Sequence, residues 1–247
     1  MGDIIKQICK NYGIWFLLGI NMFAFCLLQL AKISVSFSNY IYDLFSLPAS
    51  IDEMLLKPWT VLTYMFIHDD ISHFVTNMVC LSVVGSLASL IVDSKRIISM
   101  YVIGGLTGAL FFLFFYSVIP PSFSENNLLL GSSAALYAIL VFITLKKSIL
   151  EFKIKYLVYF PFRWLVGALL LLNLLGLTGE NYAANFSHLG GAFGGVLFYI
   201  FHRLSGKDIS NPSEENNSLE ALMEKIKNSG YSSLSIEEKK SLLDKNK

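Results

Sequence analysis

The stretch "NNLLLGSSAALYAILVFITL", residues 126–145, is a run of 20 residues without a charged side chain. An α-helix needs about 20 mostly apolar residues to cross the hydrocarbon core of a bilayer. The run therefore predicts a membrane span. Near its start it carries Gly131, Ser132 and Ser133, which are poor choices for a helix that only has to sit in lipid. This small polar turn indicates that a hydroxyl group has a function inside the membrane.

The rest of the chain repeats the charge-free pattern. Of its 247 residues 54% are apolar and only 15% charged, whereas soluble domains carry about 25% charged residues. The fifth run is the shortest, and Tyr156–Phe162 is expected to lengthen it. The pattern predicts an all-α, polytopic membrane protein with six spans, at Asn11–Ala31, Ile71–Val92, Ile97–Ser124, Asn126–Leu145, Trp164–Gly179 and Asn181–His202.

Charge and cysteine content exclude several classes of protein. The formal net charge is +1, which gives no bulk attraction to nucleic acid. The three cysteines are scattered and form neither a disulfide framework nor a metal-ligand spacing. We therefore expect no nucleic-acid partner, no metal and no cofactor.

Basic residues set the expected orientation. The connections after the second and fourth runs carry Lys95, Arg96, Lys146 and Lys147, whereas those after the third and fifth carry no Lys or Arg. By the positive-inside rule, both termini are expected on the cytoplasmic side.

Two regions lie outside the spans. Ile33–Asp70 is aromatic and apolar but interrupted, and we expect it to form a membrane-embedded first loop at the interface. Residues 1–204 then form the membrane domain, and 205–247 form a cytoplasmic tail. In this tail Ser235-x-x-Glu238 resembles a capping box, which predicts a short helical hairpin.

Three polar side chains from three spans are expected at one depth. Asn77, Ser133 and His188 each follow a flanking acidic residue by 7 or 8 positions, the acids being Asp70, Glu125 and Glu180. At a rise of about 1.5 Å per residue, each lies roughly 10–12 Å along its helix. One histidine or serine alone is most often structural, but the agreement of three spans favours a site.

Serine and histidine together have a specific chemistry. A serine hydroxyl becomes a nucleophile when a neutral imidazole takes its proton. The resulting oxyanion needs preorganised donors, and His73 and Asn77 lie four residues apart on one helix face. Because no Asp or Glu lies inside the runs, Ser133 and His188 are expected to act as a dyad.

Small residues are expected to bring the two catalytic helices together. Gly191 and Gly195 share a face with His188, and Gly-x-x-x-Gly lets helices approach closely in lipid. Gly131 and the alanines beside Ser133 offer a similarly small surface.

These motifs resemble those of the rhomboid intramembrane serine proteases over roughly residues 10–204. The nucleophile motif Gly-x-Ser is matched by Gly131 and Ser133, with Tyr137 at the position of a tyrosine that packs on the catalytic histidine. The last-helix motif is matched by His188 and Gly191. The second-helix pair is matched by His73 and Asn77, with His68 at an upstream histidine, and "KPWTVLTYMFIHDDISHFVTNM", residues 57–78, is similar throughout.

The chain departs from the family pattern at two positions. Thr60 follows Trp59 where the family commonly has arginine, which puts the anchoring of the first loop in question. Ala134 follows the nucleophile where glycine is usual, and its methyl group restricts the local turn.

The resemblance implies a six-helix bundle that hydrolyses single-pass membrane proteins near the outer face, without metal. Its partners are then transmembrane protein substrates and the lipid bilayer. The compact six-span form resembles bacterial members, which implies a bacterial inner membrane. One alternative is a rhomboid-like protein that binds membrane clients without cleaving them. The other is a small transporter, for which intramembrane carboxylates or broken helices would be expected.

Overall fold

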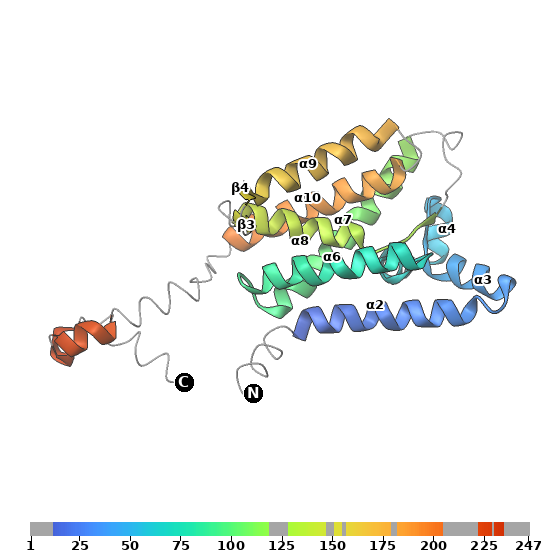
Figure 1. Ribbon diagram of the computed structural model, residues 1–247. Helices are drawn as coiled ribbons and strands as arrows, with labels where there is room; N and C mark the ends of the chain where they lie inside the picture. The colour runs from blue at the N-terminus through green and yellow to red at the C-terminus, as the bar shows by residue number, and fades with distance from the viewer. Residues whose placement is uncertain are drawn as a thin grey trace. The chain divides into compact units, whose positions relative to one another are not determined.

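A computed structural model describes residues 12–118, 128–146, 151–154, 157–178, 182–204, 222–228 and 230–234. The chain divides into two compact units, Met1–Ser205 and Gly206–Lys247. The first unit is mostly helical, and its helices lie alongside one another (Figure 1).

Three of the described helices are long and apolar enough to cross a membrane: α2 (Tyr12–Ala31), α6 (Ile71–Ser89) and α7 (Ser94–Val118). Two shorter apolar helices follow, α8 (Ser133–Lys146) and α9 (Phe162–Leu175). The last helix of the unit is α10 (Tyr182–Leu204). The predicted all-α membrane bundle is thus confirmed in its main features, and the protein is an integral membrane protein.

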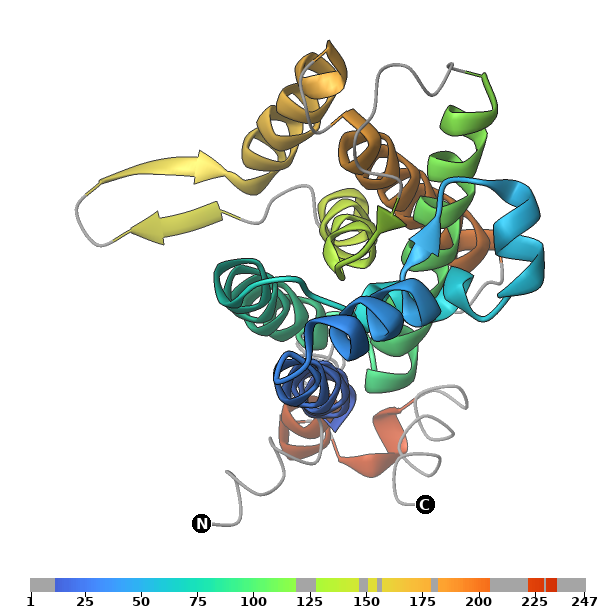
Figure 2. The same ribbon diagram turned by 90° about the vertical axis from the view of Figure 1, so that its right-hand side faces the viewer.

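Helix α8 lies at the centre of the bundle. It contacts α6, α7, α9 and α10, which surround it when the helices are viewed nearly end on (Figure 2). Its buried residues cover most of its circumference, and the remaining stripe of Ser133, Tyr137, Leu140 and Thr144 is half-buried. The helix that begins with Ser133 is therefore enclosed by the elements that carry the other polar residues.

The region between α2 and α6 forms a series of short elements. These are α3 (Val35–Phe45), α4 (Ile51–Leu56), α5 (Thr60–Thr63) and the 3₁₀ turn η1 (Tyr64–Phe66). Strand β1 (Leu47–Pro48) pairs antiparallel with β2 (Leu128–Leu129), which precedes α8. The first loop is thereby joined to the segment that leads into the turn at residues 131–133, which carries the predicted nucleophile and is called the nucleophile turn below.

The predicted start of the fourth span at Asn126 is wrong. Residues Leu128–Leu129 form strand β2, and helix α8 begins only at Ser133. Gly131 has φ +105°, in the left-handed region that ends regular structure before the helix and that favours glycine.

The predicted extension of the fifth span through Tyr156–Phe162 is also wrong. Strand β4 (Leu157–Pro161) pairs antiparallel with β3 (Glu151–Ile154), and α9 begins at Phe162. Proline has no N–H for a helix interior, so a helix starts readily after Pro161 but does not run through it. Among the residues that the structure describes, the two small sheets are the departures from an all-α fold.

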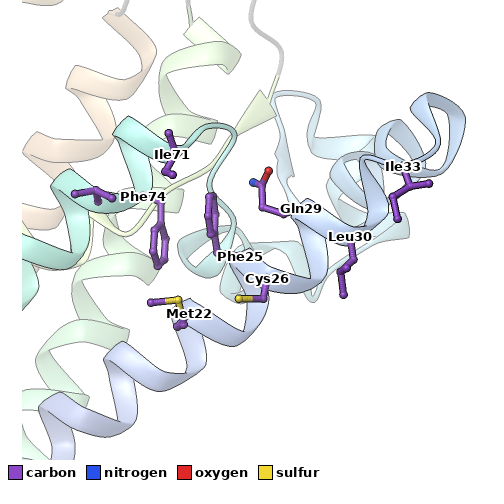
Figure 3. Close-up of a pocket in the computed structure, with 9 residues that line it drawn as sticks. Met22, Phe25, Cys26, Gln29, Leu30, Ile33, Ile71 and Phe74 are labelled. Atoms are coloured by element: carbon purple, nitrogen blue, oxygen red, sulfur yellow. The ribbon is translucent and has the colours of Figure 1, made fainter.

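An open apolar groove lies between α2 and α6 (Figure 3). Except for Ile33, which follows α2, its lining belongs to helices that are apolar enough to span a membrane, and none of the predicted site residues contributes to it. It is lined by Met22, Phe25, Cys26, Gln29, Leu30, Ile33, Ile71, Phe74 and Val75.

The second unit is small in its described part. Residues 222–228 are helical, and a 3₁₀ turn follows at Tyr231–Ser233. Gly230 between them has φ +77°. The predicted capping box Ser235-x-x-Glu238 lies outside the described residues.

Candidate active site

The structure brings Ser133 and His188 together across the contact between α8 and α10. The Ser133 hydroxyl oxygen lies 2.7 Å from His188 Nε2. Both side chains are partly exposed, so a reacting group can reach them. The pair has the distance and the exposure that a nucleophile and its base require.

The close approach of α10 to α8 depends on glycine. A methyl group on Gly191 would overlap the carbonyl oxygen of Ala134, and one on Gly195 would overlap that of Ala138. The two predicted packing glycines thus lie directly on the backbone of α8, as in other Gly-x-x-x-Gly contacts in membranes.

The methyl group of Ala134 has its own space. It faces Gly108 of α7, where an added Cβ would lie 2.6 Å from it. Ala134 is in regular helix, which needs no left-handed backbone. The departure from the family pattern at this position is therefore accommodated by a glycine on the neighbouring helix.

His73 lies on the other side of the nucleophile turn. A Cβ built on Gly131 would be 2.7 Å from His73 Nε2, so the ring lies against the glycine. The other ring nitrogen, Nδ1, is 2.7 Å from Asp69 Oδ1. Asp69 holds the ring with Nε2 toward the turn that presents Ser133.

The start of α6 is fixed by a cap. The Asp70 carboxylate accepts from the backbone N–H groups of Ser72 and His73, at 2.7 and 2.9 Å. These hydrogen bonds lower the pKa of Asp70, and the bond from the Ser72 hydroxyl has the largest effect. Satisfying the free N–H groups of a helix start in this way fixes the backbone that carries His73.

Asn77 is buried one turn further along α6. Its amide donates to the His73 carbonyl oxygen at 3.0 Å. Within the described residues no hydrogen bond joins Asn77 to Ser133 or His188. The structure thus places His73 directly against the nucleophile turn, and Asn77 contacts the backbone of His73.

Two side chains hold the imidazole of His188. The ring of Tyr137 stacks on it with the centroids 4.8 Å apart and an interplanar angle of 22°. Asn173 Oδ1 of α9 lies 2.6 Å from His188 Nδ1. Asn173 was not predicted from the sequence, because it belongs to neither the Ser-His pair nor the His73–Asn77 pair, although this amide interrupts a run of leucines.

His68 is fully buried beneath the nucleophile turn. Its Nε2 lies 3.4 Å from the Ser132 hydroxyl oxygen, and its ring packs edge-on against His73 and Phe74. The pKa of His68 is lowered to about 4, mainly by burial and to a smaller extent by the nearby His73. The hydroxyl of the adjacent Ser132 therefore faces His68, whereas the hydroxyl of Ser133 faces His188.

The first loop is anchored without the arginine that is common in the family. The Trp59 indole donates to the Leu44 carbonyl at 2.8 Å, and the Thr63 hydroxyl donates to that of Phe45 at 2.8 Å. Lys57 forms an ion pair with Asp43. Thr60 is buried and donates to the Lys57 carbonyl at 2.7 Å, closing the turn.

The arrangement provides a nucleophile, a base and donors for a developing negative charge. The Ser133 N–H is at the first position of α8, where backbone N–H groups have no partner within the helix. His73 faces the same turn from α6. These groups fit acyl transfer from a carbonyl substrate.

Comparison with known proteins gives two matches. The model of the Rhomboid domain family matches residues 56–204, which is more than half of the chain. The chain is also similar to RHOMBOID-like protein 7 of Arabidopsis thaliana, with 28% identity over 146 residues. This match covers 56% of the chain and 41% of the plant protein, so the chain spans less than half of that relative's length.

Proposed function

The chain belongs to the rhomboid family, and from this premise we propose that it is an intramembrane serine endopeptidase. The proposal rests above all on the 2.7 Å distance between the Ser133 hydroxyl and His188 Nε2. Its substrates are single-pass membrane proteins cleaved near the outer face of the membrane.

The reaction begins with proton transfer. His188 Nε2 takes the proton of Ser133 as the hydroxyl oxygen attacks the scissile carbonyl carbon. The peptide C–N bond then breaks as His188 returns the proton to the leaving amine. A water molecule, deprotonated by the same imidazole, releases the acyl group from Ser133.

The oxyanion that forms on the substrate needs donors on the other side of the turn. The Ser133 N–H is one, and His73 is a second. When both ring nitrogens carry a proton, His73 donates a hydrogen bond through Nδ1–H to Asp69 and presents Nε2–H beside Gly131. Asn77 supports this group through its bond to the His73 carbonyl and supplies the remaining amide hydrogen.

The proposed membrane arrangement has six spans: α2, α6, α7, α8, α9 and α10. Lys95, Arg96 and Lys146 lie at one end of these helices, opposite the ends at which α6 and α8 begin. With the basic ends cytoplasmic, Ser133 and His73 lie toward the outer face, and both termini are cytoplasmic. The resemblance to compact bacterial members supports a bacterial inner membrane.

The test is cleavage of a generic single-pass substrate in liposomes. The purified full chain is compared with Ser133→Ala, His188→Ala and the matched variant Ser132→Ala. We expect the first two to lose roughly 10³-fold or more in rate. Ser132→Ala is expected to keep most of the activity, because its hydroxyl faces His68 and not His188.

Three results would contradict the proposal in different ways. Equal cleavage by wild type, Ser133→Ala and His188→Ala would assign the activity to other residues or to a contaminant. Loss with Ser132→Ala alone would place the nucleophile at the neighbouring serine. Substrate capture without cleavage by the folded wild type would favour a client-binding protein.

A further inference from the structure

Asn173 is the single polar side chain between Trp164 and Leu175. Its neighbours Leu172 and Leu174 are exposed, whereas Asn173 is 6% exposed. With Phe162 and Val166 it forms the buried stripe of α9, which faces the bundle. Burying an amide costs free energy unless its groups are hydrogen-bonded. The role of Asn173 therefore follows from its hydrogen-bond partners.

The partners of Asn173 determine which way its amide points. Its Nδ2 lies 2.7 Å from the Leu169 carbonyl oxygen and 2.6 Å from the Tyr137 hydroxyl. A backbone carbonyl only accepts hydrogen bonds, so the NH₂ group must face Leu169. The side-chain oxygen then necessarily faces His188.

The orientation of the amide in turn determines the tautomer of His188. The Asn173 carbonyl oxygen is an acceptor, and it lies 2.6 Å from His188 Nδ1. Nδ1 must therefore carry the proton in the neutral ring. The lone pair then resides on Nε2, which is 2.7 Å from the Ser133 hydroxyl.

Stacking alone does not provide this selection. The Tyr137 ring fixes the plane of the imidazole, but a parallel aromatic face makes no distinction between the two ring nitrogens. Asn173 bonds to both partners of that stack, since its NH₂ donates to the Tyr137 hydroxyl while its oxygen accepts from His188. The Tyr137 ring thus fixes only the plane of the His188 imidazole, and the Asn173 amide determines which ring nitrogen carries the proton.

We propose that Asn173 is a positioning residue that keeps His188 in the Nδ1–H tautomer with Nε2 aimed at Ser133. The arrangement is then a Ser-His-Asn triad built from three helices, α8, α10 and α9, in place of a dyad. Its consequence for cleavage rests on the proposed protease function. Its consequence for the tautomer is a property of the resting protein.

The experiment compares the full chain with Asn173→Leu, Asn173→Asp and the lipid-facing control Leu172→Ala. Two quantities are measured in detergent micelles: kcat and KM as functions of pH, and the ¹⁵N spectrum of labelled histidine. The His188 signals are assigned by their absence in His188→Ala. Spectra are also recorded in a Ser133→Ala background, which needs no activity.

Asn173→Leu removes the acceptor, and we expect kcat to fall about 10- to 100-fold with little change in KM. In the same variant the His188 spectrum should lose the predominance of the Nδ1–H form. Leu172→Ala should match wild type in both measurements.

Asn173→Asp keeps an acceptor and adds a negative charge. The titratable side chains that face His188 in the described structure are Tyr137 of α8 and His73 of α6. A new carboxylate favours the protonated imidazole, so the acid limb of the rate profile should move to higher pH while Nδ1 stays protonated. If Asn173→Leu does not fold, this variant decides the question.

An unchanged kcat and an unchanged His188 tautomer in folded Asn173→Leu would overturn the proposal. So would an acid limb in Asn173→Asp identical to that of wild type. If the wild-type chain cleaves no substrate, the protease proposal fails, whereas the spectra in the Ser133→Ala background still decide the role of Asn173.

Discussion

The two helices that carry His188 and its hydrogen-bond partner Asn173 contact α8 in different ways. Helix α10 meets it backbone to backbone, with Gly191 on Ala134 and Gly195 on Ala138. Helix α9 has no glycine in such a contact: nothing lies within 4 Å of a Cβ built on Gly167. It reaches the site through one amide, Asn173.

This difference separates two requirements of catalysis. The distance from nucleophile to base depends on how closely two helices approach, which is a question of side-chain volume. The direction of the base depends on a donor and an acceptor, which is a question of hydrogen bonding. The α8–α10 contact sets the distance between Ser133 and His188, and the α9 contact sets the direction of the ring.

Gly191→Ala is expected to have the largest effect. The added methyl group overlaps the carbonyl oxygen of Ala134, which cannot move without shifting α8. We expect a loss of about 3 kcal/mol in the free energy of unfolding and about 100-fold in kcat, because a displacement near 1 Å misplaces the base. Denaturant titration in micelles and liposome cleavage measure the two quantities.

The matched control for this variant is Gly19→Ala on α2, where nothing lies within 4 Å of an added Cβ. Wild-type stability in Gly191→Ala would show that α10 can shift to admit a methyl group. The distinction between a distance-setting and a direction-setting helix would then not hold.

The close contact was predicted from the sequence, and the directional one was not. Gly191 and Gly195 repeat at four residues in phase with His188, and helical periodicity alone places them on one face. Asn173 belongs to neither the Ser-His pair nor the His73–Asn77 pair that the proposed chemistry requires, so it was not singled out. A search for any polar residue in an apolar run would have found it, because an amide also requires partners in lipid.

Backbone conformation before α8 and α9 also escaped prediction. Counting charge-free residues estimates transfer into lipid, and that quantity is similar for a strand and a helix of the same composition. The apolar pair Leu128–Leu129, which lies in strand β2, would therefore give the same estimate of transfer into lipid if it were helical. The information lay in Gly131 and Pro161, which mark the points where each helix begins.

The hydrogen-bonded surroundings of the nucleophile turn should respond to pH, whereas the glycine contact should not. Burial lowers the pKa of His68 from its ordinary 6.5 to about 4. Between these values the unfolded chain binds more protons than the folded one, so stability is complete above pH 6.5 and falls as the pH drops toward 4. Between pH 7 and 5 the loss attributable to His68 is about 2 kcal/mol.

The measurement is denaturant unfolding in micelles at several pH values, for wild type and His68→Gln. The variant lowers the absolute stability, since it alters a buried contact with Ser132. Its stability should nevertheless depend less steeply on pH in this range. Equal slopes for the two proteins would remove His68 as the source of the acid sensitivity.

Gly167→Ala is expected to have the smallest effect and the opposite sign. Gly167 is exposed in the interior of α9, and an added methyl group meets no atom within 4 Å. Alanine loses less backbone entropy than glycine in a helix, which stabilises the protein by about 0.5 kcal/mol. The same substitution therefore destabilises at Gly191 and stabilises at Gly167, because one helix is held by backbone contact and the other is not. If denaturant titration showed that Gly167→Ala lowers the free energy of unfolding by more than about 1 kcal/mol, α9 would also pack closely against the bundle. Asn173 would then not be the only contact through which α9 reaches the site.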